Sequence, residues 1–410
     1  MTVDAHRFPR TLLLVNSPPG SAGVGELFLR DLAQHCPPGK LFRYSTVQGA
    51  GRDWPERWCG APSAVSQVPH SRIPILTSRH LHKFLATGRD AMAREVSAFA
   101  LRHEAEVLWL VLSSGFTIAL SERLVGLLGL PYVVTVMDMP EYMAANQGWS
   151  GTTRASIMRA FDTVVGGARA VGAASASMAR LLSERYGQDP IVQIHAVHPS
   201  LCRPAGPVPA GRSEFVVAFA GSLYAKREWN ALLSGIDLLG GRLHGKRILV
   251  RFIGRFPRLG ARRASFVTDM GVRSLQETLS MLSTADVAYL PYWFDERYAL
   301  VTRTSFPNKL SAYLAAGLPT LFHGPAEASP VEFFRRFPVG PLCHSLAPGR
   351  IAAALESVED PGTREQITRA RHDAVREELN LDVFVGRFGR LLGVERDALL
   401  PLRPPDNDDY

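Results

Sequence analysis

Short apolar segments of strand length recur along this chain, and stretches with helical periodicity separate them. A strand that is apolar at almost every position is buried on both faces, which is typical of a parallel sheet covered by helices on each side. The first half therefore predicts a doubly wound α/β domain. Its predicted strands are 11–15, 107–112, 132–136, 170–174 and 191–194, and its predicted helices are 26–34, 78–103, 118–128 and 177–186.

The same alternation restarts after residues 201–214, whose Pro- and Gly-rich composition is that of a linker. It predicts a second doubly wound domain followed by closing helices. The predicted strands are 215–220, 248–253, 265–267, 287–290 and 319–322, and the predicted helices are 229–239, 274–283, 308–316, 351–356, 363–377 and 381–392.

We therefore expect two Rossmann-like domains, at 1–200 and 215–385, as the length of 410 residues also suggests. A closing helix at 386–400 is expected to pack back on the first domain, and 401–410 to form a disordered tail. Two such domains leave a cleft where the carboxyl ends of both sheets face each other. Open α/β sheets bind their ligands at that edge.

Composition excludes several classes of function. The 46 Lys and Arg and the 38 Asp and Glu are shared between the halves, so neither half is a basic module and nucleic acid is not an expected partner. A polyanionic ligand or an acidic membrane surface stays open. Four scattered cysteines without a C-x-x-C spacing indicate neither a zinc site nor a disulfide framework.

The sequence also shows neither a signal peptide nor a run of eighteen apolar residues. We expect a cytoplasmic protein that meets a membrane, if at all, from the side. The poorly periodic region 48–72, with Trp54 and Trp58, is a candidate acceptor-binding or membrane-facing loop. His80 and His82 are interpreted as surface or packing residues, because they lack partners at metal-binding spacing.

Two glycine-containing turns follow predicted strands. Gly221 ends one strand and is followed by Lys226 and a helix, so free backbone N–H groups and a cation could meet an anion there. A tight turn with solvated charges is the alternative. The earlier turn holds Gly20, Gly23 and Gly25, but its two prolines remove donors. It is a weak nucleotide fingerprint, and a flexible loop facing the cleft is preferred.

Two further loops after strands carry polar or aromatic groups. Asp138 and Glu141 follow the strand 132–136 and could act in acid–base chemistry, although Asp138 could equally cap a turn. The loop 291–298 combines aromatic side chains with Asp295 and Glu296, which suits stacking on a sugar or base. A self-packed aromatic loop is the alternative.

The segment 304–320 contains Lys309, one of only five lysines in a chain whose other cations are arginines. A lysine retained against that bias suits a place that needs a compact ammonium group.

Together these pieces resemble the nucleotide-sugar domain of GT-B glycosyltransferases of the glycosyltransferase 4-like type. The resemblance covers about 110 residues, and the first half matches only in outline. The matching segments are AFAGSLYAKREWNALLSGIDLL (218–239), ILVRFIGR (248–255), FVTDMGVRSLQETLSMLSTADVAYLPY (266–292) and FPNKLSAYLAAGLPTLF (306–322).

The resemblance implies a donor site on the second domain. It assigns the diphosphate to Gly221, Ser222 and Lys226, with Arg227 beside them, and the base to the backbone of 270–272. Asp295 and Glu296 are further donor-side candidates. The residues implied in donor binding are Gly221, Ser222, Arg227, Met270, Gly271, Val272, Asp295, Glu296, Ser305, Phe306 and Asn308.

The sequence departs from the family pattern where its members bind the nucleotide ribose. Thr304 and Ala312 stand where the family carries acids, and Met137 stands where a histidine is often found. These changes leave ribose recognition and a histidine-based proton transfer without their usual residues.

We expect a metal-independent glycosyltransferase that uses a nucleotide-diphosphate sugar as co-substrate and no cofactor. Lys226, Arg227 and Lys309 would offset the charge of the leaving diphosphate, and Asp138 would position or deprotonate the acceptor. Gly23, Gly25 and Glu141 are the other acceptor-side candidates; the acceptor is a saccharide, a lipid-linked saccharide or a small molecule. A sugar-nucleotide epimerase and a catalytically degenerate binding subunit are the alternatives.

Overall fold

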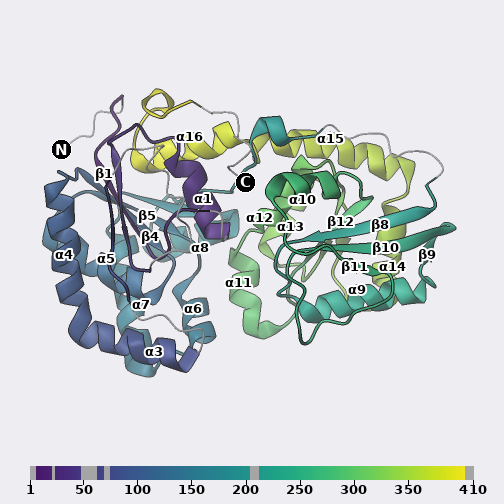
Figure 1. Cartoon of the computed structure of the whole chain (residues 1–410), viewed down its shortest axis with the longest axis horizontal. Helices are drawn as coiled ribbons and strands as arrows, with labels where there is room; N and C mark the ends of the chain where they lie inside the picture. Colours follow the sequence, from purple (N-terminus) through teal and green to yellow (C-terminus); the bar gives the residue numbers. More distant parts are fainter. Residues whose placement is uncertain (1–5, 21–23, 48–61, 69–73, 204–211, 402–410) are drawn as a thin grey trace. The chain divides into compact units, whose positions relative to one another are not determined.

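The computed structural model describes residues 6–20, 24–47, 62–68, 74–203 and 212–401. It divides into two compact units (Figure 1). The first runs to Gln193 and is completed by the segment that begins at Phe384, and the second runs from Ile194 to Val383. The sequence instead placed the end of the first domain at residue 200. Most of the predicted linker and the predicted tail lie outside the described residues.

The first unit is built on a seven-stranded sheet in which every neighbouring pair is parallel. Its strand order is β3-β2-β1-β4-β5-β6-β7, so the direction of winding reverses between β1 and β4. The strands are β1 (Thr11–Val15), β2 (Leu41–Ser45), β3 (Ser63–Val65), β4 (Val107–Leu112), β5 (Tyr132–Val136), β6 (Ala170–Ala173) and β7 (Ile191–Val192).

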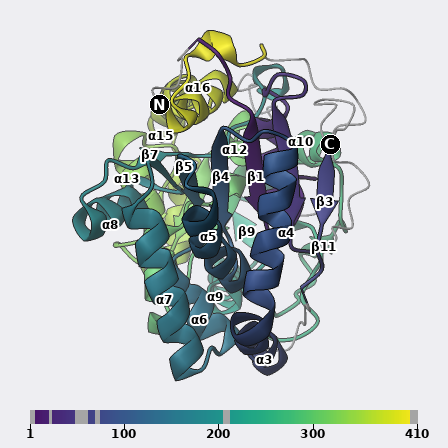
Figure 2. The ribbon, with the colours of Figure 1, turned by 90° about the vertical axis from the view of Figure 1, so that its left-hand side faces the viewer.

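Helices cover this sheet, and Figure 2 shows α4, α5 and α7 side by side in front of it. The helix predicted at 78–103 is in fact α3, a π-helical turn η1 and α4. The sequence analysis also missed α6 and α7. The elements are α1 (Val24–Ala33), α3 (Pro74–Lys83), η1 (Phe84–Gly88), α4 (Arg89–Arg102), α5 (Gly115–Leu128), α6 (Pro140–Gln147), α7 (Gly151–Gly166) and α8 (Ala176–Tyr186).

The helix α16 (Leu381–Leu392) lies near the end of the chain and packs on the first unit. The ring of Phe384 meets Phe28 edge-on at 5.0 Å, and the ring of Phe388 lies 4.6 Å from that of Trp109. These aromatic rings are buried, so the C-terminal segment completes the core of the unit that the N-terminal half begins.

The second unit repeats the doubly wound arrangement with the strand order β11-β10-β8-β12-β13-β14. These strands are parallel, and β9 adds an antiparallel hairpin to β10. The winding reverses between β8 and β12. The strands are β8 (Glu214–Ala220), β9 (Arg242–Leu243), β10 (Lys246–Ile253), β11 (Val267–Asp269), β12 (Val287–Pro291), β13 (Thr320–His323) and β14 (Leu342–Cys343).

The core of the second unit lies between its sheet and the helices α9 and α14, with Trp229 at its centre. The Trp229 ring contacts Phe219 and Phe252, which come from the paired strands β8 and β10. The helices of this unit are α9 (Lys226–Leu238), α10 (Leu275–Leu282), α11 (Ala299–Thr304), α12 (Asn308–Ala315), α13 (Ser329–Arg336), α14 (Pro348–Ser357) and α15 (Pro361–Glu377).

Both units are therefore open, doubly wound α/β sheets. Such sheets bind ligands beyond the carboxyl ends of their strands, at the point where the strand order reverses. The switch points here are β1/β4 in the first unit and β8/β12 in the second. Within the described residues, no helix has the length and apolar composition needed to cross a bilayer.

Candidate functional site

Two glycines meet at the carboxyl end of β8, beside the switch point of the second unit. Gly221 has φ +97° and donates its N–H to the carbonyl of Ile253 at 2.8 Å. Gly254 has φ +143°, and a Cβ atom added there would come within 2.5 Å of the Gly221 carbonyl oxygen. The positive φ favours glycine at both positions, and at Gly254 the close approach of the two backbones also leaves no room for a side chain.

Lys309 lies in the first turn of α12 and reaches this glycine turn. Its Nζ donates to the Ser222 carbonyl at 3.2 Å and lies 4.4 Å and 4.7 Å from the ring centroids of Phe219 and Tyr224. No carboxylate of the described residues forms an ion pair with it. Burial lowers the pKa of Lys309 from 10.5 to about 7. The structure thus holds an ammonium group between two aromatic rings without a counter-ion.

The helices that begin beside Lys309 leave their first N–H groups without a side-chain cap. Ala225 precedes α9 and Pro307 precedes α12, and neither supplies a capping hydrogen bond. Helix starts carry partial positive charge, although backbone carbonyls already take up the N–H groups of Lys226 and Leu310, at 3.1 Å and 2.9 Å. Together with Lys309 they form a place suited to an anion.

Lys226 is the first residue of α9, and its side chain runs along the loop after β10. A Cβ atom on Gly260 would lie 3.1 Å from the Lys226 Cδ. Asn230 ties this loop to α9, donating to the Gly260 carbonyl at 3.1 Å and accepting from the Arg262 N–H at 2.7 Å. Lys226 therefore lies against the loop after β10, Lys309 contacts the turn that starts at Gly221, and Arg227 is exposed.

The base-side residues named from the sequence lie directly after β11. The Gly271 carbonyl accepts from the Gly254 N–H at 2.8 Å, and the Met270 N–H donates to Phe252 at 2.8 Å. Gly271 has φ +70°, and the Val272 side chain is 69% exposed. The loop 270–272 is thus joined through Gly254 to the turn at Gly221.

The aromatic loop after β12 is packed on itself and on the same turn. The Trp293 ring stacks on Tyr298 at 4.7 Å and contacts Tyr224 at 4.4 Å. Asp295 accepts from the backbone and guanidinium of Arg297, which lowers its pKa to about 2. Its carboxylate is therefore already paired, whereas Glu296 is exposed.

Glu228, which the sequence analysis did not select, links α9 to this loop. Its side chain is buried, its Oε1 accepts from the Phe294 N–H at 2.9 Å, and its carbonyl accepts from the Tyr289 hydroxyl at 2.9 Å. Burial raises the pKa of Glu228. An acid in the first turn after Lys226 was the available signal, but its partner lies 66 residues away in sequence.

The residues before α12 have mainly packing contacts. The Ser305 carbonyl accepts from the Tyr292 hydroxyl at 3.3 Å, and the Phe306 ring meets Phe333 edge-on at 5.4 Å. Thr304 is buried, and its hydroxyl donates to the Leu300 carbonyl at 2.8 Å. Asn308 begins the helix and is half-buried.

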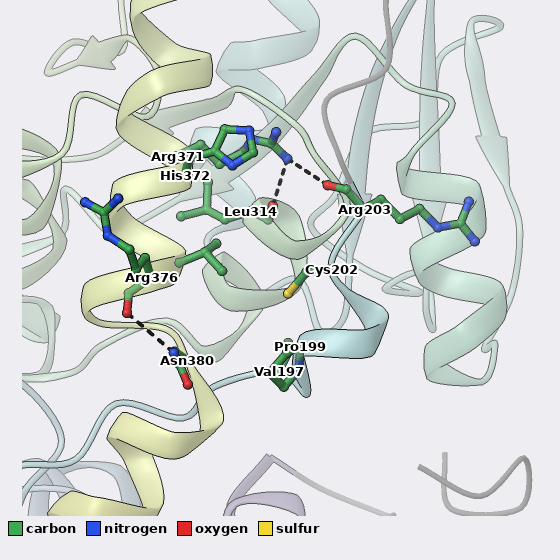
Figure 3. Close-up of a pocket in the computed structure, with 10 residues that line it drawn as sticks. Val197, Pro199, Cys202, Arg203, Leu314, Arg371, His372, Arg376 and Asn380 are labelled. Carbon is green, nitrogen blue, oxygen red and sulfur yellow. Dashed lines mark hydrogen bonds between the residues drawn. The ribbon is translucent and has the colours of Figure 1, made fainter. Parts of the chain in front are cut away.

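A cavity of about 360 Å³ lies at the other end of α12, also within the second unit (Figure 3). Buried Arg371 donates to the carbonyls of Leu314 and Arg203, at 3.4 Å and 3.2 Å, and so closes the carboxyl end of α12. The guanidinium groups of Arg203 and Arg376 point away from the cavity. We interpret these contacts as support for the helix that carries Lys309.

The described acceptor-side candidates of the first unit follow two different strands, β1 and β5. Asp138 follows β5, is half-buried, and has a pKa raised by burial. Glu141 is paired with Arg185 at 2.7 Å, and the same guanidinium binds Asp162. Met139, not Asp138, is the N-cap residue of α6, and no side chain caps that helix. Gly25 is exposed in α1, and Gly23 lies outside the described residues.

No known family profile matches the chain, and no curated protein sequence matches it. Solved structures match it over almost its whole length. HepE of Anabaena, in complex with UDP-glucose, is 14% identical with a TM-score of 0.64, covering 93% of this chain and 99% of that one.

Two other matches have equally low identity. Sucrose-phosphate synthase from Thermosynechococcus elongatus has a TM-score of 0.65 at 13% identity, over 93% of this chain and 98% of that one. WaaG, a glycosyltransferase of lipopolysaccharide biosynthesis, has a TM-score of 0.57 at 16% identity, over 92% and 100% of the two chains. The resemblance seen in the sequence is thus confirmed at the level of the fold: this chain has the GT-B fold of glycosyltransferases.

Proposed function

We propose that this protein is a glycosyltransferase that binds a nucleotide-diphosphate sugar on its second unit and transfers the sugar to an acceptor held by the first. The observation that carries the proposal is Lys309, an ammonium group that no carboxylate of the described chain pairs with, beside Gly221 at the switch point β8/β12. Ligand diphosphates bind where uncapped helix starts and cations coincide.

In the proposed reaction, this site must stabilise the negative charge of the nucleoside diphosphate that leaves the donor. Lys309, Lys226 and the starts of α9 and α12 are proposed to take up this charge without a metal ion. Asp138 is proposed to position or deprotonate the acceptor. The donor and the acceptor are also proposed to bind in a cleft between the two domains. Chelation of divalent cations is expected to leave turnover unchanged.

UDP-glucose is the first donor to test, because HepE was crystallised with it. The experiment measures release of nucleoside diphosphate with a panel of saccharide, lipid-linked and small-molecule acceptors. In the Lys226→Ala/Lys309→Ala variant we expect turnover to disappear while the circular dichroism spectrum is kept. Near-native kcat/KM in that variant would overturn the mechanism.

The matched control is Lys40→Ala/Lys246→Ala. Lys40 and Lys246 lie at the amino ends of β2 and β10, at the edges of the sheets where ligands do not bind. This variant is expected to keep wild-type turnover.

A binding subunit without activity is the second candidate, and the buried Thr304 favours it. Thr304 and Ala312 stand where the resembling family carries acids, and the Thr304 hydroxyl is taken up by the Leu300 carbonyl. Calorimetry separates the two candidates. Nucleotide binding without hydrolysis or transfer to any acceptor would support the binding subunit.

A further inference from the structure

The cavity in Figure 3 is lined by basic side chains and by no acidic one. It lies within the second unit, between the carboxyl end of α12, the helix α15 and the segment 197–203. Among the described residues, no Asp or Glu lines it, whereas four basic residues do: Arg203, Arg371, His372 and Arg376. Its volume of about 360 Å³ is within the range of sites for small molecules.

Arg371 is the buried charge of this cavity, and it is only 3% exposed. Its Nη1 donates to the carbonyls of Leu314 and Arg203. Its Nε and Nη2 are covered from water and have no hydrogen-bond partner among the described residues, and no carboxylate of those residues pairs with it. Burial lowers the pKa of Arg371. A buried cation without a counter-ion is costly, so an anion bound beside it would be stabilising.

The two other arginines stand at the rim of the cavity. In Figure 3 the guanidinium groups of Arg203 and Arg376 point away from it. Both residues are exposed: Arg203 donates to the Ser283 hydroxyl at 3.0 Å, and Arg376 pairs with Asp373 at 2.7 Å. Exposed contacts of this kind are weak, so these side chains can exchange them for contacts to a ligand.

The remaining lining is apolar or neutral. Val197, Leu314 and Val375 contribute apolar side chains, and Asn380 contributes an amide. A phosphate group alone would leave most of the volume empty. The apolar side chains suit the carbon skeleton of a larger ligand.

We propose that this cavity binds a small organic phosphate, such as a sugar phosphate, whose phosphate group is the counter-ion of Arg371. Nε and Nη2 form one edge of the planar guanidinium, and such an edge binds two oxygens of a phosphate side by side. A phosphate monoester also carries more negative charge than a carboxylate, which fits a lining with several basic residues. Arg371 and Lys309 contact opposite ends of α12, so this site is separate from the proposed donor site and either can fail without the other.

The test uses Cys202, which lines the cavity, as a reporter of its occupancy. Cys36 and Cys343 are buried, so in the full-length Cys59→Ser protein the half-buried Cys202 is the thiol expected to react with a water-soluble disulfide reagent. Ribose 5-phosphate at about ten times its Kd should slow this labelling about tenfold, because only the unoccupied cavity reacts. Ribose, which lacks the phosphate, should not slow it.

Two variants in the same background remove the proposed attraction. Arg371→Gln should bind ribose 5-phosphate about 30-fold more weakly, as loss of charge-assisted hydrogen bonds implies. Asn380→Asp leaves Arg371 intact and keeps the side-chain oxygen that accepts from the Asp382 N–H at 2.8 Å. It should weaken binding at least about tenfold, because a carboxylate in the lining repels the phosphate. Circular dichroism checks that both variants are folded.

The matched control is Arg369→Gln, which removes an exposed arginine of α15 that does not line the cavity. It is expected to bind like the wild type. The proposal is wrong if ribose 5-phosphate does not protect Cys202, or if Asn380→Asp is protected as well as the wild type. Protection that Lys309→Ala abolishes and Arg371→Gln keeps would assign the phosphate to the donor site and would also overturn it.

Discussion

The switch points of the two units have the same strand topology, but the helix that follows is capped in the first unit and uncapped in the second. In the first unit, α5 starts directly after β4, and Ser114 and Thr117 form a capping box that occupies the N–H groups of both residues. Gly115 then lies under Leu81 and Trp149. In the second unit, α12 starts after Pro307 with no capping side chain, and Lys309 forms no ion pair with the residues that the structure describes.

This difference indicates a structural role for the capped helix start and a ligand-binding role for the uncapped one. A capping box and close packing satisfy the start of a helix within the protein. An uncapped start and a half-buried cation are local costs that a bound anion can offset, and such departures concentrate at functional sites. The comparison therefore supports the proposed donor site at β8/β12 and indicates a structural role for the start of α5.

The largest expected effect comes from removing the unpaired cation. Lys309→Ala is expected to lower kcat/KM by about 10²- to 10³-fold, as loss of a fixed donor to developing charge does elsewhere. Lys246→Ala is the control, because Lys246 is paired with Glu359 at 2.7 Å. Steady-state kinetics with saturating acceptor measure both. A threefold or smaller loss in Lys309→Ala would remove the distinction between the two switch points.

Closing the glycine turn should have the next largest effect. Gly254→Ala places a Cβ atom 2.5 Å from the Gly221 carbonyl at a φ of +143°, so the turn must move. Nucleotide affinity measured by calorimetry is expected to fall about 30-fold, and stability by about 2 kcal/mol. Gly25→Ala, where no atom lies within 4 Å of the added Cβ, is the control and should leave affinity unchanged.

The pH dependence of donor binding should reveal the state of Lys309. Its pKa of about 7 in the free protein rises when a diphosphate binds, so binding takes up a proton. Affinity is expected to fall about tenfold from pH 6 to pH 8, as the ammonium is lost. Calorimetry in buffers of different ionisation enthalpy measures the uptake. The Lys309→Arg variant should show no such proton uptake, because a guanidinium stays charged.

The lowered pKa of Lys309 also affects the free energy of unfolding, which should rise with pH where donor affinity falls. Burying a charged Lys309 costs stability in full below pH 7. The cost is relieved as the pH rises from about 7 to the ordinary lysine value of 10.5, because the unfolded chain then binds more protons than the folded one. Relative to Lys309→Met, the wild type should therefore gain stability across this window in denaturant titrations.

The smallest effect is expected at the switch point of the first unit, where the start of α5 is capped. Ser114→Ala should lower the free energy of unfolding by about 1 kcal/mol and leave nucleotide affinity unchanged. Ser150→Ala is the control: Ser150 precedes α7 but makes no capping bond to its backbone. A loss of nucleotide affinity in Ser114→Ala would contradict the structural role given to the start of α5.

The sequence predicted most of the central strands but missed β2, whose sequence LFRYS interrupts its apolar residues with Arg43. β1, β4 and β5 match their predicted ranges, because a buried parallel strand must be apolar at nearly every position. The short strand β3 was missed at the edge of its sheet, where its residues are only partly buried. The helix α6 was missed because its sequence PEYMAANQ carries no apolar stripe.

The sequence indicated which residues could form the candidate donor site, but it did not indicate which of them contact each other. The glycine turn and Lys309 stood out in the sequence, one by its place after a strand and the other by its rarity. The buried Glu228 did not, because its partner on the aromatic loop is brought close only by folding. Asp295 looked available in the sequence, yet Arg297 two residues later pairs with it.

By itself, the sequence determined that this protein forms two parallel α/β sheets, since apolar strands alternating with helices have few other ways to be buried. Tertiary structure decided which residues meet at the switch point. Ser222 and Lys309 lie 87 positions apart, and only the pairing of β8 with β12 and the packing of α12 bring the ammonium to that carbonyl. Contacts of that kind depend on the whole fold, because no local pattern specifies a partner so far along the chain.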